Sequence, residues 1–115
     1  MARVEIVNPA EISDPSIDAI FDWVTKMEGS VPNHFLVELN FPEYFVAKLS
    51  STKVLWELGE LAIDEIQHIG ILVSKANGCP YCTAAFCTIL NHGLKTESNY
   101  IKEVITKGID VVDSD

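Results

Sequence analysis

The chain of 115 residues has few basic side chains and no long apolar run. Eight Lys and Arg stand against 17 Asp and Glu, which gives a formal net charge of -9. A surface that binds nucleic acid needs clustered basic residues, and so does one that binds an anionic membrane. No apolar run approaches the roughly 20 residues that cross a bilayer. We therefore expect neither nucleic acid nor a membrane as a partner.

The N-terminal sequence also lacks the apolar core of a secretory signal. Residues Met1 to Glu5 lead into polar and acidic residues instead. The expected location is therefore cytoplasmic, a compartment in which thiols are kept reduced. The chain has three cysteines, and a close pair in that compartment is more typical of catalysis or metal binding than of a structural disulfide.

No run of strands, internal repeat or low-complexity segment is evident, which predicts an all-α protein. We expect one domain over residues 1–115, folded as a compact bundle of about five to six helices. Residues 1–13 are predicted to form an extended arm, on the surface or on a neighbouring subunit. Residues 110–115 are predicted to form a solvated acidic tail.

Caps and apolar spacing predict where the helices begin and end. Asp14 and Pro15 form an N-cap followed by proline, and Gly29 suits the C-terminus of that helix. An apolar stripe predicts a helix over 42–58. The sequence from Pro80 to about Asn91 is almost wholly apolar or small, which predicts a helix buried on most sides. Further helices are expected over 34–39, 62–76 and 96–108.

The most distinctive segment is Asn77-Gly78-Cys79-Pro80-Tyr81-Cys82, between two apolar runs. Gly78 is expected to end the preceding helix, and Pro80 to begin the next. Cys79 then becomes the N-cap, and Cys82 lies in the first turn. Unpaired backbone N–H groups and the helix dipole at that end favour a thiolate over a thiol. The pair is therefore placed for thiol chemistry.

Two general interpretations of the pair compete. Cys-Pro-Tyr-Cys is the active-site tetrapeptide of glutaredoxins, but that fold needs a preceding strand and a later proline, and neither is found here. Cys79, Cys82, Cys87 and His92 also have the spacing Cys-x2-Cys-x4-Cys-x4-His, which is that of a zinc knuckle with two ligands exchanged. On one helix, however, Cys82 and Cys87 differ by about 140°, so a tetrahedral site would require a break in that helix. We favour Cys87 as a small buried hydrophobe.

The segment from Leu61 to Lys95 carries a wider pattern. An apolar helix precedes Asn-Gly-Cys-x-Tyr-Cys, and a further helix ends at Gly93 before Thr96-Glu97 begins another. Phe41-Pro42-Glu43 adds an upstream Pro-Glu helix start. In these features residues 31–109 resemble the carboxymuconolactone decarboxylase and AhpD-like alkylhydroperoxidase family.

The resemblance implies an all-helical bundle that assembles into trimers or hexamers. It also implies that Cys82 attacks a hydroperoxide and that Cys79 resolves the product as a disulfide. The family's Glu and His, which relay the proton, fall on Gln67 and Phe86, and neither of these side chains transfers protons near neutral pH. Asp64, one helical turn before Gln67, is the substitute carboxylate that we expect.

The sequence therefore predicts a thiol-disulfide oxidoreductase with weak hydroperoxide reduction, using Cys82 and Cys79. A dithiol reductant is the expected partner besides copies of the chain, and neither a metal nor an organic cofactor is expected. Tyr81 is expected to be a packed ring whose hydroxyl reaches the thiols. The alternative is a non-catalytic oligomeric module in which Gln67 and Phe86 mark a retired site. Lactone decarboxylation ranks lowest, because no His-rich pocket is evident.

Overall fold

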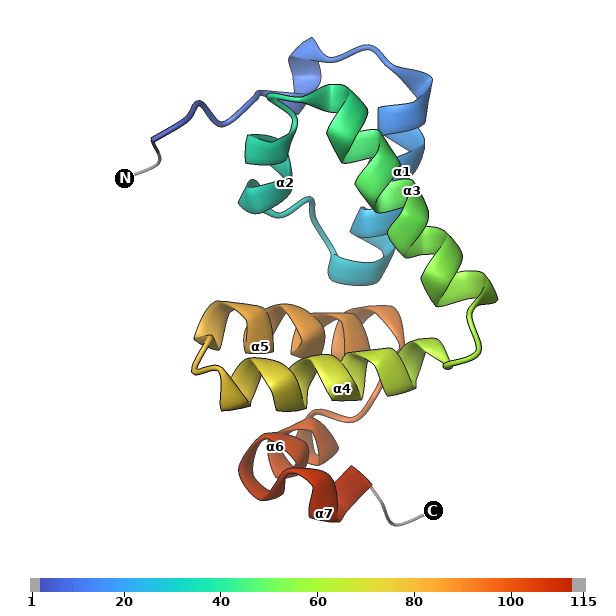
Figure 1. The fold of residues 1–115 in the computed structure, drawn as a ribbon. Coiled ribbons are helices and arrows are strands. Elements are labelled where there is room, and N and C mark those ends of the chain that lie inside the picture. The colour runs from blue at the N-terminus through green and yellow to red at the C-terminus, as the bar shows by residue number, and fades with distance from the viewer. Residues whose placement is uncertain (1–2, 113–115) are drawn as a thin grey trace. The chain divides into compact units, whose positions relative to one another are not determined.

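A computed structural model describes residues 3–112, which form seven α-helices and no strands (Figure 1). Five of these helices have seven or more residues, and the all-α prediction is confirmed. The chain divides into two compact units, the first ending at Leu58 and the second beginning at Gly59. The single domain therefore stays a prediction.

The first unit contains α1 (Pro15–Glu28), α2 (Asn33–Glu38) and α3 (Pro42–Leu58). The predicted start of α1 is confirmed, because the Asp14 carboxylate accepts a hydrogen bond of 2.8 Å from the Ser16 N–H. Gly29 ends α1 with φ of 84°, a left-handed conformation that glycine adopts without a steric cost.

Aromatic and branched side chains fill the core of the first unit. Phe45 of α3 is completely buried, and its ring meets those of Phe21 and Phe35 edge-on, with centroids about 6 Å apart. The other buried members of this cluster are Ile17, Ile20, Val24, Leu39 and Leu49.

The predicted apolar stripe of α3 is only half correct. Phe45 and Leu49 are buried, but Val54, Leu55 and Leu58 in the second half of the helix are exposed, Leu58 by 80%. The sequence pattern fitted a helix but did not separate a buried face from an exposed one, because apolar residues occur all round it.

Hydrogen bonds attach the N-terminal arm to α2 and to the residues that follow it in the first unit. The Val7 N–H donates to the Leu36 carbonyl over 3.2 Å, and Asn40 Nδ2 donates to the Glu5 carbonyl over 2.7 Å. A short 3-10 turn, η1 (Pro9–Glu11), interrupts the extended arm that was predicted. Residues 1–2 of the predicted arm lie outside the described residues.

The second unit contains α4 (Ile63–Ala76), α5 (Pro80–Thr88), α6 (Ser98–Lys107) and α7 (Ile109–Val112). The helices α4 and α5 run side by side in opposite directions (Figure 1). A π-helical turn, η2 (Ile89–Gly93), extends α5. The central core cluster is aliphatic and consists of Ile71, Leu90, Ile101 and Val104.

The prediction that the helix after Pro80 is buried on most sides is wrong. No residue of α5 is fully buried, and the buried side chains begin only at Ile89 in η2. Small side chains make α5 apolar without filling a core, and one face borders an open hollow. After η2 the chain turns with Lys95 at φ of 61°, whereas the predicted cap had placed the turn at Gly93.

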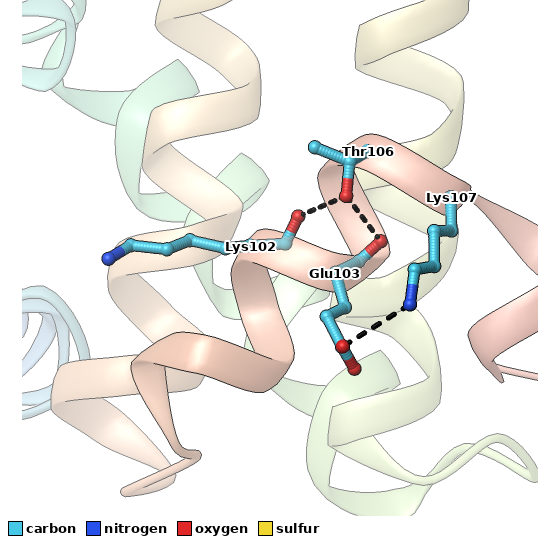
Figure 2. Close-up of polar contacts among 4 residues, drawn as sticks. All are labelled: Lys102, Glu103, Thr106 and Lys107. Carbon is cyan, nitrogen blue, oxygen red and sulfur yellow. Dashed lines mark hydrogen bonds and ion pairs between the residues drawn. The ribbon is translucent and has the colours of Figure 1, made fainter.

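The outer face of α6 is polar (Figure 2). Lys107 Nζ lies 3.3 Å from Glu103 Oε1, and the Thr106 hydroxyl donates to the carbonyls of Lys102 and Glu103. The opposite side of α6 carries Ile101 and Val104, which are buried in the core of the second unit.

The solvated acidic tail is corrected at its beginning. Residues Ile109–Val112 form α7, and Val111 and Val112 pack partly buried against the core of the second unit. Burial of the two valines outweighs the acidic neighbours in sequence, which remain exposed where described. Residues 113–115 lie outside the described part. None of the helices in residues 3–112 has the length and apolarity to cross a membrane.

Candidate functional site

The turn between α4 and α5 places the cysteine pair, as the sequence predicts. Gly78 has φ of 65°, so it turns the chain at the end of α4 in a conformation that other residues adopt only with strain. The Cys79 N–H donates to the Ser74 carbonyl over 2.9 Å and so ties the turn to the last turns of α4. Pro80 is then the first residue of α5.

Cys79 and Cys82 form a disulfide across the first turn of α5, with their Cα atoms 5.4 Å apart. Cys79 is the N-cap, and its Sγ accepts a hydrogen bond of 3.2 Å from the Cys82 N–H. The Thr83 hydroxyl donates to the Cys79 carbonyl over 2.9 Å. The predicted placement of both cysteines on α5 is therefore confirmed.

This hydrogen bond distinguishes the two sulfurs. After reduction, a backbone N–H aimed at Cys79 Sγ stabilises negative charge there, as does the positive end of the α5 dipole. The interaction resembles the capping of a helix by a carboxylate. The local geometry therefore favours a thiolate at Cys79 over one at Cys82.

An open hollow of about 650 Å³ adjoins the pair. Cys79 lines it and Cys82 does not. At its edge, Lys75 Nζ donates to the Ile105 carbonyl and joins α4 to α6. The lining is mostly apolar and consists of Lys75, Gly78, Cys79, Pro80, Thr83, Ala84, Cys87, Thr88 and Ile105.

Sequence reasoning missed this hollow. Cys79, Thr83 and Cys87 recur every four residues and so share one face of α5, which was a usable signal. The contributions of Lys75 and Ile105 come from other helices, and nothing in the sequence pattern placed them beside the cysteines.

The two positions that the resemblance gives to the proton relay, Gln67 and Phe86, are packed inside the second unit. Gln67 is completely buried, and neither atom of its amide has a hydrogen-bond partner among the described residues. One turn further along α4, a Cβ on Gly70 would lie 2.5 Å from Cδ1 of Phe86. The Phe86 ring thus rests on the α4 backbone, and α4 and α5 approach closely because residue 70 is glycine.

Asp64 does not share the surroundings of Gln67, although one helical turn separates them. Asp64 is exposed, and its carboxylate has no hydrogen bond or ion pair within residues 3–112. Its backbone carbonyl accepts from His68 Nδ1 over 2.7 Å, and His68 Nε2 lies 3.0 Å from the Tyr100 hydroxyl. The structure therefore gives no support to Asp64 as a substitute for the relay carboxylate.

The prediction of a packed Tyr81 ring is wrong, because Tyr81 is 59% exposed. It lies at the second position of α5, where the side chain points away from the unit's core.

Cys87 is half-buried in the wall of the hollow, and burial raises the pKa of its thiol above the ordinary value. A raised pKa keeps Cys87 protonated and unreactive near neutral pH. It lies eight residues, or about 12 Å along α5, from Cys79, too far to form a disulfide with it. Within residues 3–112, no three His, Cys, Asp or Glu side chains cluster as metal ligands would.

The chain matches no protein-family model, no curated protein and no solved structure at a significant level. Its function is therefore inferred from the residues and geometry of the cysteine pair.

Proposed function

We propose that the chain is an AhpD-like thiol-disulfide oxidoreductase whose Cys79 and Cys82 alternate between a disulfide and a dithiol. The observation that carries this proposal is the pair at the start of α5, with the Cys82 N–H bonded to Cys79 Sγ beside an open apolar hollow. Such a pair accepts electrons from a dithiol protein or small dithiol and passes them to a substrate.

The geometry favours Cys79 as the attacking thiolate. It accepts the helix N–H and faces the hollow, whereas Cys82 does neither. The family resemblance assigns the attack to Cys82 instead, so the order of the two sulfurs is the first point to test.

In the peroxidase reaction, the thiolate of Cys79 attacks the distal oxygen of an alkyl hydroperoxide and breaks its O–O bond. The products are a Cys79 sulfenic acid and an alkoxide, which takes a proton to become the alcohol. The Cys82 thiol then attacks the sulfenic sulfur, and the disulfide forms with release of water. A dithiol reductant restores both thiols by two exchanges and leaves as its own disulfide.

This turnover is slow, because Gln67 and Phe86 do not transfer protons. General acid-base transfer contributes about 10² to 10⁴ in rate, and neither side chain supplies it. Disulfide exchange depends less on such a relay, because a thiolate leaves without prior protonation. We therefore expect exchange with disulfides to exceed reduction of hydroperoxides.

A second candidate is the non-catalytic oligomeric module. The completely buried Gln67 without hydrogen-bond partners and the Phe86 ring against Gly70 favour it, since both replace proton-transfer groups by packing. Ile69 and Val73, four residues apart on α4, are about half exposed and would suit an interface between copies of the chain. A trimer or hexamer remains part of both proposals, and analytical ultracentrifugation measures it.

Alkylation of the thiols against pH tests the proposed function. Each cysteine of the pair is measured with the other replaced by serine, in a Cys87→Ser background that removes the third thiol. We expect a pKa for Cys79 below the free value of about 8.5, and a higher pKa for Cys82. A lower value at Cys82 would support the family's order. Ordinary or raised values at both would leave the non-catalytic module.

A further inference from the structure

The first unit contains a pocket of its own, remote in sequence from the cysteines. Trp23 of α1 and Trp56 of α3 form two of its walls, with ring centroids 5.3 Å apart and planes inclined by 58°. Phe35 of α2 contributes a third ring. The volume is about 190 Å³, and the complete lining is Trp23, Val24, Met27, Glu28, Phe35, Lys48, Leu49, Thr52 and Trp56.

Glu28 is the acidic group in this lining. Its carboxylate has no hydrogen bond or ion pair with any residue of the described range 3–112. Burial raises the pKa of Glu28 to about 7. Glu28 is also the last residue of the 14-residue helix α1, whose C-terminal end favours a positive charge and disfavours a negative one.

The other charged group in the lining is already neutralised. Lys48 Nζ lies 2.6 Å from Glu38 Oε1, so its charge is paired with a carboxylate that is not part of the lining. The Thr52 hydroxyl donates to the Lys48 carbonyl over 3.0 Å and keeps its own lone pairs available as acceptors. The rings, the free carboxylate and the helix end therefore all favour a cation.

We propose that this pocket binds a small organic monocation of the alkylammonium class. The aromatic rings of Trp23, Trp56 and Phe35 in the lining offer π-electrons to the cation, and the Glu28 carboxylate supplies the opposite charge. A volume of about 190 Å³ corresponds to about six water molecules, which suits a methylated ammonium but not a peptide. The site belongs to the first unit and does not depend on the proposed redox function.

Binding depends on pH through Glu28. Its carboxyl is mostly protonated at pH 6 and mostly ionised at pH 8, and only the ionised form attracts the cation. The pocket is also bordered by Lys48, which pairs with Glu38. His34 is a further titratable group: burial lowers its pKa, Glu38 raises it and Lys48 lowers it. We expect binding about tenfold weaker at pH 6 than at pH 8, and a Glu28→Gln variant without this dependence separates Glu28 from His34.

Tryptophan fluorescence measures the binding directly, because the chain has two tryptophans and both line this pocket. The full-length protein is titrated with tetramethylammonium chloride at pH 8, with sodium chloride at equal ionic strength and tert-butanol as a neutral ligand of similar shape. We expect a saturable change with tetramethylammonium alone, with a dissociation constant on the order of 1 mM. An equal change with tert-butanol, or none with tetramethylammonium, would overturn the proposal.

A pair of variants then tests the role of the carboxylate. Glu28→Gln keeps the shape and removes the charge, and we expect at least tenfold weaker binding. Asp22→Asn makes the same change of charge at an exposed position of α1 and should bind as the wild type does. Equal binding by Glu28→Gln and the wild type contradicts a cation site at Glu28. The comparison of ligands on the wild-type protein decides the matter even if a variant folds poorly.

Discussion

The two units differ in what they bury. In the first unit every fully buried side chain described is apolar, and aromatic rings surround Phe45. In the second unit the buried core is aliphatic, and it also contains Gln67 and Ser74, the two buried polar residues of the described chain. An unsatisfied buried amide costs about 1 to 3 kcal/mol. Glu38 Oε2 of the first unit is also buried without a hydrogen-bond partner among residues 3–112, so both units contain an unsatisfied polar group, but only in the second unit is the whole side chain buried.

The largest expected effect concerns the thiols of the second unit. Cys79→Ser removes the sulfur that accepts the Cys82 N–H, and we expect disulfide exchange with a dithiol to fall by at least about 10³-fold. Reduction of a chromogenic aromatic disulfide by the reduced protein measures the rate. Cys87→Ser is the matched control, because Cys87 lines the same hollow and should leave the rate within about twofold. Loss of activity in that control would contradict the assignment of Cys87 as unreactive.

The next effect concerns the contact between Gly70 of α4 and the Phe86 ring of α5. Gly70→Ala places a methyl group 2.5 Å from the Phe86 ring, and overpacking of this kind costs about 1 to 3 kcal/mol. Urea unfolding followed by circular dichroism measures the loss. A second substitution, Phe86→Leu, should restore part of it, since the smaller side chain frees space above residue 70. Independent, additive losses would show that the two residues do not share this contact.

The same variant tests whether the units unfold separately. Both tryptophans lie in the first unit, so tryptophan emission reports that unit alone. If Gly70→Ala shifts the circular dichroism transition and leaves the emission transition unchanged, the units unfold independently. A joint shift would support the single domain that the sequence predicts.

A smaller effect is expected at Gln67. Replacing it by Met keeps the approximate volume and removes the amide atoms that lack partners, which should stabilise the second unit by about 1 kcal/mol. Denaturant unfolding measures the gain, and disulfide exchange should be unchanged. A loss of exchange activity in Gln67→Met would mean that the amide takes part in the reaction and that the relay is not simply retired.

Sequence patterns predicted the backbone of the site better than its surroundings. The caps at Asp14 and Cys79 and the breaks at Gly29 and Gly78 were correct, because they depend on neighbouring residues alone. The exposure of Tyr81, the hollow beside Cys79 and the isolation of Asp64 from Gln67 depend on which helices meet, and spacing along one helix does not determine that. The aromatic pocket of the first unit was missed for the same reason, since its rings come from three helices.

The smallest expected effect returns to the first unit, whose core is otherwise apolar. The pKa of Glu28 is about 7 in the folded protein and 4.5 for an unperturbed glutamate side chain, so the folded state binds more protons between these values. The stability of the first unit therefore falls as the pH rises from about 4.5 to 7, and then levels off. Since Glu28 is partly exposed, solvent screening reduces the effect to about 1 kcal/mol. Glu28→Gln should be more stable than the wild type by that amount at pH 8 and nearly equal at pH 5, as followed by tryptophan emission in urea. Asp22→Asn should differ from the wild type equally at both pH values. An identical pH dependence in the wild type and Glu28→Gln would show that Glu28 ionises normally.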